Sequence, residues 1–226
     1  MGYMGAKSGD GVFQPIIALM PPHDTYLEPF AGTAAILKRK AAAFQSVALD
    51  LDPMMAAQLA TLPRTTAICG CGLEYLETFD PRRQGRVLVY ADPPYVLATR
   101  TGRSRYIHEF TDQDHRRLAA ALHRLSALGV AVILSGYPSS LYDELYGAGW
   151  QTREFQAMTR GGVRTEKLWF NFDPGAAHWH TFAGRDFTDR QRIKRKAERW
   201  AARYAALPAA EAQAVLAAML AVGDRP

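Results

Sequence analysis

The feature that most constrains the fold is a short apolar run, Val87–Ala91, that ends in the sequence Asp92-Pro93-Pro94-Tyr95. The run is too short for a helix and rich in strand-forming residues, which predicts a buried strand. The two prolines fix φ and remove two backbone N–H groups, so the strand must stop in a stiff turn with outward carbonyl groups. A carboxylate and an aromatic ring therefore stand together at the carboxyl end of a strand.

Such a turn can bind an exocyclic amine. Asp92 and the Pro93 carbonyl can accept its two N–H bonds, and Tyr95 can stack on the attached ring. The four residues resemble the (Asn/Asp/Ser)-Pro-Pro-(Tyr/Phe/Trp) motif of amino-methyltransferases, and the Asp form is most similar to Dam-like DNA adenine-N6 methyltransferases. The resemblance implies that Asp92, Pro93, Pro94 and Tyr95 are catalytic and that S-adenosylmethionine is the cofactor. An ordinary proline-rich turn is the alternative interpretation.

A second segment, 25–36, predicts a strand, a tight turn and a helix. Gly32 allows a ligand to approach the backbone, and the helix N-terminus would offer free N–H groups. The G-x-G-x-x-G spacing is absent, which argues against NAD and FAD. The segment resembles motif I of the same family, (Asp/Glu)-Pro-Phe-x-Gly-x-Gly, which implies that Glu28, Phe30 and Gly32 bind the cofactor. Ala34 stands where that motif has its second glycine.

An acidic residue about 20 positions past a nucleotide-binding turn normally meets the ribose hydroxyls. Asp50 follows a short apolar run at that distance, and we expect it to be the ribose ligand. Asp52 is the competing residue, but its position before Pro53 is typical of a helix N-cap.

The N-terminal sequence Tyr3-Met4-Gly5-Ala6-Lys7 resembles motif X of the family. The resemblance implies that Tyr3, Gly5 and Lys7 enclose the methionine end of the cofactor, with Asp92 at the same site. A frayed, solvated terminus is the alternative interpretation.

The remaining pattern up to residue 172 predicts further strands and helices in alternation, closed by a hairpin around Gly161 and Gly162. The expected fold is α/β, a Rossmann-like methyltransferase fold whose seven-stranded sheet is mostly parallel with one antiparallel strand, followed by a C-terminal helical extension. We expect a methyltransferase domain at 1–172 and a basic helical extension at 173–226.

The net charge of +5 is concentrated in the extension. Residues 185–203 hold six Arg and two Lys against three acidic residues, so the rest of the chain sums to zero. Phosphate contact by this helix is favoured over a merely solvated surface. The segment between the third strand and the catalytic turn is too short for a recognition module, so base recognition is expected from other arginines. The expected nucleic-acid contacts are Arg100, Arg103, Arg105, Arg160, Arg164, Arg195 and Arg199.

These observations predict transfer of a methyl group from S-adenosylmethionine to adenine N6 in DNA, on a flipped or single-stranded base. An RNA adenine methyltransferase and an inactive nucleic-acid-binding relative remain alternatives. Ser at position 92 would favour cytosine N4 instead, and Asn would favour protein glutamine. A restriction partner is left undetermined.

Two cysteines, Cys69 and Cys71, without a nearby histidine cluster argue against a metal site. They are better explained as reduced thiols in a cytoplasmic protein. No apolar run approaches the roughly 20 residues of a membrane span, so no membrane partner is expected.

Overall fold

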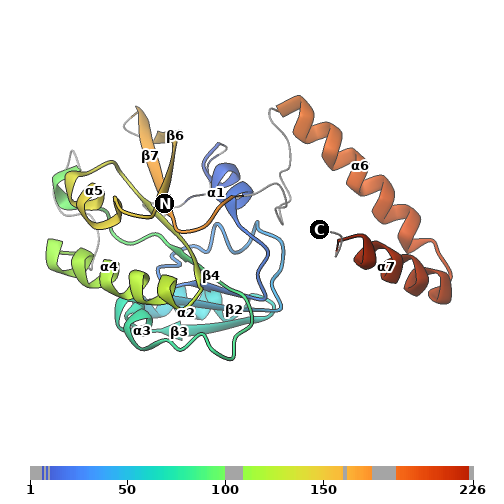
Figure 1. The fold of residues 1–226 in the computed structure, drawn as a ribbon, viewed down its shortest axis with the longest axis horizontal. Helices are drawn as coiled ribbons and strands as arrows, with labels where there is room; N and C mark the ends of the chain where they lie inside the picture. The colour runs from blue at the N-terminus through green and yellow to red at the C-terminus, as the bar shows by residue number, and fades with distance from the viewer. Residues whose placement is uncertain are drawn as a thin grey trace. The chain divides into compact units, whose positions relative to one another are not determined.

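The computed structural model describes residues 7, 9, 11–99, 109–159, 162–174 and 187–223. The chain divides into two compact units, Met1–Thr181 and Phe182–Pro226. The first unit holds the sheet and the second holds two helices (Figure 1).

The first unit is built on a seven-stranded sheet with the strand order β3-β2-β1-β4-β5-β7-β6. Its strands are β1 (Thr25–Glu28), β2 (Gln45–Asp50), β3 (Thr65–Cys69), β4 (Val87–Ala91), β5 (Ala131–Gly136), β6 (Gln151–Thr159) and β7 (Gly162–Phe170). The pairings from β3 to β5 are parallel, and β7 runs antiparallel to both β5 and β6. The expected sheet, mostly parallel with one antiparallel strand, is therefore confirmed.

Strand β4 lies in the middle of this sheet, between β1 and β5. All five of its residues are buried, as expected for a continuous apolar strand covered on both faces. Leu27 of β1 and Val132 of β5 both pair with Val89. Because the three strands are parallel and in register, their carboxyl ends meet at one edge of the sheet, where Asp92 leaves β4.

The helices of the first unit are α1 (Phe13–Leu19), α2 (Pro53–Leu59), α3 (Gly72–Thr78), α4 (Asp112–Ala127) and α5 (Ser140–Tyr146), with the 3-10 turn η1 at Leu97–Thr99. Helix α4 begins with a capping box in which Thr111 and Asp114 bond each other's backbone N–H groups. Its leucines at 118, 122 and 125 are buried against the sheet. Gly129, with φ +81°, ends the helix and admits the turn into β5.

Both faces of the sheet are covered. On one face, Leu27, Val89 and Val132 of the strands pack with apolar residues of α3, α4 and α5 in the main core. On the other face, Ala48 of β2 packs with Leu59 of α2 and with the segment after β1. Neighbouring strand residues point to opposite faces, so β2 contributes Leu49 to the first core and Ala48 to the second.

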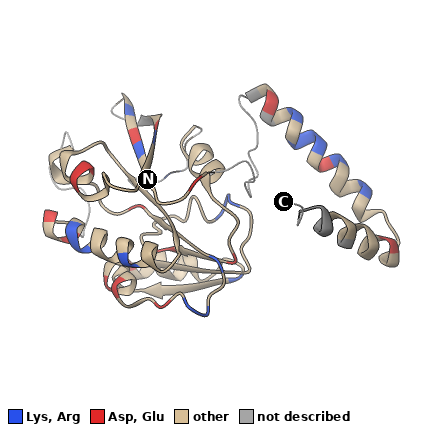
Figure 2. Cartoon of the chain, in the orientation of Figure 1, with Lys and Arg blue, Asp and Glu red and all other residues tan. Residues whose placement is uncertain are grey.

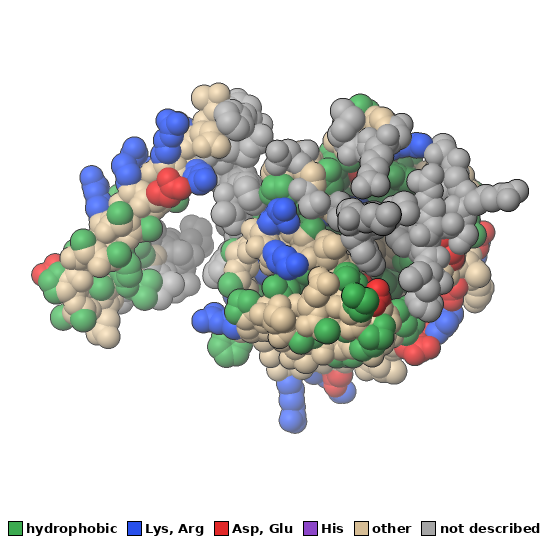
Figure 3. All heavy atoms as spheres, turned by 180° about the vertical axis from the view of Figure 1, so that it is seen from behind, with side chains coloured by type: hydrophobic (Ala, Val, Ile, Leu, Met, Phe, Trp, Pro, Cys, Tyr) green, Lys and Arg blue, Asp and Glu red, His purple; other side chains and the backbone are tan. Residues whose placement is uncertain are grey.

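The second unit consists of α6 (Phe187–Ala205) and α7 (Ala209–Gly223), shown in Figure 1. Basic residues recur along α6, seen as the blue bands in Figure 2 and as a row of basic side chains in Figure 3. Within the unit, Trp200 and Tyr204 of α6 line an apolar pocket with Leu216 and Met219 of α7. Among the described helices, none combines the length and apolar character that crossing a membrane requires.

Candidate active site

The residues of the proline turn lie at the carboxyl end of β4, at the edge where the three central strands end. Pro93 and Tyr95 are buried, while the side chain of Asp92 is 15% exposed. The turn thus presents one carboxylate to a site with little water around it.

Lys7 is the charged partner of that carboxylate. Its Nζ lies 3.0 Å from Asp92 Oδ1, and the Lys7 side chain is only 7% exposed. Burial raises the pKa of Asp92 above its ordinary value, and the nearby Lys7 ammonium lowers that pKa in the opposite direction. Lys7 thus contacts Asp92, and its expected contact with the methionine end of the cofactor stays a prediction.

The Tyr95 hydroxyl connects Lys7 to a second carboxylate. It accepts a hydrogen bond from Lys7 Nζ at 2.6 Å and donates one to Glu166 Oε2 at 2.6 Å. Lys7 Nζ also lies 4.8 Å from the centroid of the Tyr95 ring. Tyr137, which follows β5, packs edge-to-face against Tyr95 with ring centroids 4.6 Å apart. Lys7 therefore contacts both Asp92 and Tyr95, the two groups expected to receive the target base.

Glu166 and Tyr137 belong to this site but were not among the predicted site residues. Gly136 pairs with Lys167 in the antiparallel ladder between β5 and β7, so the next residues, Tyr137 and Glu166, meet beyond the end of β5. A signal existed for Glu166, because it shares one face of its strand with buried Leu168. Burial raises the pKa of Glu166, while the charge of Lys7 lowers it.

Motif I forms the neighbouring part of the edge. Glu28 at the end of β1 is 3% exposed and accepts a hydrogen bond from the Tyr26 hydroxyl at 2.9 Å. Burial raises the pKa of Glu28 to about 8, so its carboxyl is largely neutral at pH 7. Phe30 packs edge-to-face against Phe110 at 5.6 Å. These contacts fix the start of the turn that leads to Gly32.

The helix expected after Gly32 is wrong. Residues 32–39 form consecutive turns. Gly32 and Ala34 both adopt left-handed conformations, with φ of +49° and +54°, and such residues cannot continue a right-handed helix. Ala34 thus adopts the left-handed backbone that a glycine would adopt without strain, which accounts for the glycine of the motif at this position.

The Asp50 side chain accepts hydrogen bonds from the turn after β1 and from the turn that follows its own strand, β2. Its Oδ2 accepts from the Gly32 N–H at 2.8 Å, and its Oδ1 accepts from the Asp52 N–H at 2.9 Å. The competing residue, Asp52, is the N-cap of α2 and accepts from the Met54 N–H, with Pro53 in the first turn. The expected N-cap role of Asp52 is confirmed, and the ribose contact of Asp50 stays a prediction.

Gly72 allows α3 to approach motif I. A Cβ at this position would lie 1.9 Å from the Pro29 carbonyl oxygen, so only glycine fits. The preceding residue, Cys71, is half-buried and does not cap the helix with its side chain. Within the described part of the chain, no three His, Cys, Asp or Glu side chains gather as a metal site would require.

The predicted nucleic-acid contacts are only partly described. Arg100, Arg103, Arg105 and Arg160, like Tyr3 and Gly5 of the cofactor site, lie outside the described residues. Arg164 is half-buried on β7. Arg195 and Arg199 are exposed on α6.

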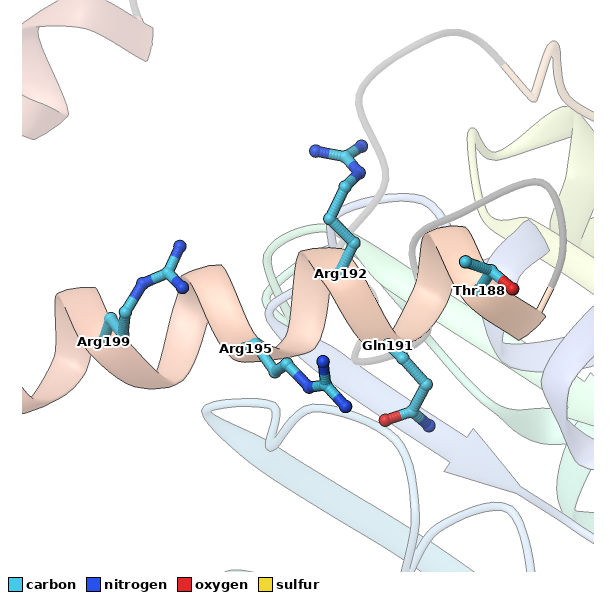
Figure 4. Close-up of a pocket in the computed structure, with 5 residues that line it drawn as sticks. All are labelled: Thr188, Gln191, Arg192, Arg195 and Arg199. Carbon is cyan, nitrogen blue, oxygen red and sulfur yellow. The ribbon is translucent and has the colours of Figure 1, made fainter.

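The basic face of α6 contains a pocket lined by Thr188, Gln191, Arg192, Arg195 and Arg199, drawn in Figure 4. Gln191 and Arg195, one turn apart, point to the same side of the helix in Figure 4. Arg192 is bound to Asp189 at 2.7 Å, whereas Arg195 and Arg199 form no ion pair with any described residue. Their charges are therefore available to a phosphate group.

The fold and the site indicate the general class of protein before its family. The mostly parallel sheet with its single reversed strand, β7, agrees with the expected Rossmann-like methyltransferase fold. An N-methyltransferase from Bradyrhizobium japonicum is similar at 8% identity, with 71% of this chain and 93% of that chain covered and a TM-score of 0.48. Magnesium protoporphyrin IX methyltransferase from Synechocystis, with bound S-adenosylmethionine, is similar at 14% identity, with 66% and 70% covered and a TM-score of 0.42. A methyltransferase from Leishmania major is similar at 13% identity, with 70% and 68% covered and a TM-score of 0.49.

The family follows from the sequence around the turn. Residues 73–165 match the family model of D12 class N6 adenine-specific DNA methyltransferases. This part of the chain is therefore similar to a family of DNA methyltransferases that act on the N6 amine of adenine. The expected enzyme class and cofactor are confirmed. The matched segment contains Asp92 and Tyr95 and ends one residue before Glu166.

Proposed function

We propose that the turn Asp92-Pro93-Pro94-Tyr95 holds the N6 amine of the target adenine during methyl transfer. The observation that carries this proposal is the position of Asp92, a carboxylate of 15% exposure at the carboxyl end of the central strand, beside the buried ring of Tyr95. Asp92 and the Pro93 carbonyl accept the two N–H bonds of the amine, which directs the nitrogen lone pair towards the methyl donor. Alignment and electrostatics then supply most of the acceleration.

The target base must leave the helix stack to reach this turn. An adenine inside a duplex cannot approach a buried carboxylate, so it is flipped out or already single-stranded. Tyr95 stacks on the base and stabilises it by about 1–3 kcal/mol, as base–aromatic contacts do elsewhere. Lys7 contacts Asp92 Oδ1 at 3.0 Å, and this contact is given up when the amine of the base binds the carboxylate.

The residues along the same edge fit the cofactor. Gly32 presents backbone without a side chain, and the Asp50 carboxylate next to it retains lone pairs for the ribose hydroxyls. Glu28, which is 3% exposed, would line the buried end of the cofactor site. The residues proposed to hold the cofactor are Tyr3, Gly5, Lys7, Glu28, Phe30, Gly32, Asp50 and Asp92. When bound, S-adenosylmethionine supplies the activated methyl group.

We further infer that Arg195 and Arg199 of α6 contact DNA phosphates, together with Arg100, Arg103, Arg105, Arg160 and Arg164 of the first unit. The exposure of Arg195 and Arg199 and their lack of described ion-pair partners support this inference. We assign residues 1–172 to the methyltransferase domain and residues 173–226 to the basic extension. We place the site of action in the cytoplasm, where DNA is accessible and the two free cysteines stay reduced.

The experiment is a transfer assay with isotopically labelled S-adenosylmethionine. Duplex DNA, single-stranded DNA and RNA of mixed sequence are incubated separately with the protein, and the labelled nucleoside is identified by mass spectrometry. The proposal expects N6-methyladenine in DNA. Label confined to RNA, or found on cytosine N4, would contradict it, and cofactor binding by calorimetry without transfer to any substrate would favour an inactive binding relative.

A further inference from the structure

The hydroxyl of Tyr95 makes two short hydrogen bonds, one as acceptor and one as donor. It accepts from Lys7 at 2.6 Å and donates to Glu166 at 2.6 Å. A tyrosine held at its hydroxyl as well as at its Cα cannot swing about its Cα–Cβ bond, so these two partners fix where the Tyr95 ring lies. Rotation of the ring about its own axis, which leaves the hydroxyl oxygen in place, is limited by Tyr137, which packs edge-to-face with ring centroids 4.6 Å apart.

Of the two partners, Glu166 is the rigid one. It lies within β7, which is paired with β5 on one side and with β6 on the other, where Glu166 faces Phe155. Glu166 is only 5% exposed. Lys7 has a flexible side chain and must leave Asp92 when a base enters, so it cannot hold the ring throughout the reaction.

The contact distances also separate the two roles that Glu166 could have. Its Oε2 lies 2.6 Å from the Tyr95 hydroxyl but 3.8 Å from Lys7 Nζ. The 2.6 Å contact is a hydrogen bond from a hydroxyl to an ionisable carboxyl group, and such bonds are stronger than hydrogen bonds between two neutral groups. The 3.8 Å contact is an ion-pair contact. Glu166 thus acts on Tyr95 first and on Lys7 second.

We propose that Glu166 is a positioning residue for the methyl-transfer reaction, whose carboxylate fixes the Tyr95 ring as the platform on which the target adenine stacks. The inference rests on the proposed role of Tyr95. It adds Glu166 of β7, one residue past the segment that the family match covers, to the functional site. Glu166 itself does not touch the base.

A double-mutant cycle tests this proposal. Glu166→Ala removes the acceptor, Tyr95→Phe removes only the hydroxyl, and the two are combined. Because Tyr95→Phe already removes the hydrogen bond to Glu166, we expect Glu166→Ala to lower kcat about tenfold and the double variant to be no slower than Tyr95→Phe alone. Cofactor affinity, measured by calorimetry, stays unchanged. Effects that multiply in the double variant would overturn the proposal.

A spectroscopic readout reports the stacking directly. The target adenine, once located by sequencing methylated DNA, is replaced by 2-aminopurine, whose fluorescence is quenched when it stacks. We expect the complex of Glu166→Ala to be brighter than the wild-type complex, and that of Glu166→Gln, whose amide oxygen can still accept from Tyr95, to resemble wild type. Equal fluorescence and kcat for Glu166→Ala and wild type would overturn the proposal.

Two controls complete the design. Glu154→Ala removes an exposed glutamate of the same hairpin and should change neither kcat nor fluorescence. If Glu166→Ala fails to fold, Glu166→Gln carries the test, and a Glu166→Gln protein that binds cofactor normally but loses both readouts contradicts the account. A wild-type protein that makes no N6-methyladenine would defeat the proposed function instead, which distinguishes the two failures.

Discussion

Lys7 and Asp92, 85 positions apart in the sequence, form a buried ion pair of 3.0 Å at the carboxyl end of the central strand. The pair joins the N-terminal segment to the proposed catalytic turn. A buried carboxylate without a partner would be costly to keep ionised, so the ammonium maintains the form of Asp92 that can accept hydrogen bonds from an amine. The same ammonium donates a hydrogen bond to the Tyr95 hydroxyl at 2.6 Å, so it contacts both side chains of the turn.

The first prediction concerns the pH dependence of Lys7→Met. Burial raises the pKa of Asp92 and Lys7 lowers it, so removing Lys7 leaves the raising effect unopposed. Because the ionised carboxylate is the active form, the acid limb of the kcat/KM profile, which reports the free enzyme, should move to higher pH, with activity falling about tenfold per pH unit below it. Lys7→Arg, which keeps the charge, should shift the limb less. An unchanged limb in Lys7→Met would show that the pair does not control Asp92.

The second prediction concerns the contact between α3 and motif I. Gly72→Ala would place a methyl group 1.9 Å from the Pro29 carbonyl oxygen, a backbone atom that cannot turn away. We expect a loss of at least about 2 kcal/mol in the free energy of unfolding, together with weaker cofactor binding. In Gly70→Ala, the new methyl group would meet only the Ile68 side chain at 3.7 Å, so its stability should change by less than about 0.5 kcal/mol. Denaturant unfolding measures the stability of both variants, and equal stability of Gly72→Ala and Gly70→Ala would contradict the close contact.

The third prediction concerns strain at Ala34. Its left-handed φ of +54° costs about 1–2 kcal/mol in a residue with a side chain. Ala34→Gly relieves this cost but loses a buried methyl group worth about 0.8 kcal/mol and gains chain entropy when unfolded, so its stability should be close to that of wild type. The neighbouring Ala35 is also buried and has an ordinary φ, so Ala35→Gly should cost about 1.5 kcal/mol. Equal losses in thermal unfolding would show that Ala34 is not strained.

The fourth prediction concerns the basic face of α6. Replacing Arg195 and Arg199 by Ala should weaken DNA binding to a similar degree for all sequences and reduce the log–log salt slope by about 0.9 for each lost phosphate contact. Arg192→Ala is the matched control, since Asp189 already neutralises that guanidinium and the slope should change less. A change in the methylated sequence would mean that these arginines read bases, and no change would mean that the face is only solvated.

Much of the sheet could be predicted from the sequence, because its signals are local. The apolar run before the two prolines predicted β4 with the observed bounds. The glycine pair predicted the hairpin of β6 and β7. Each of these features depends on residues close together in the chain.

The predictions that failed, or that were not made, concern features set by backbone conformation or by pairing between distant parts of the chain. The helix expected after Gly32 is replaced by turns, because Ala34 takes a left-handed conformation that its residue type does not suggest. Helix α1 was not anticipated. Alternation with Leu168 indicates that Glu166 is on the buried face of its strand, but its approach to Tyr95 follows from the antiparallel pairing of β7 with β5, which no local pattern specifies.

The most direct test of the central claim is the methyl-transfer rate of Asp92→Ala on DNA, measured alongside its thermal unfolding. The account predicts a folded protein whose formation of N6-methyladenine falls by at least about a thousandfold, because the amine loses the carboxylate that aligns it. A folded Asp92→Ala protein that methylates adenine at a rate close to that of wild type would contradict the account.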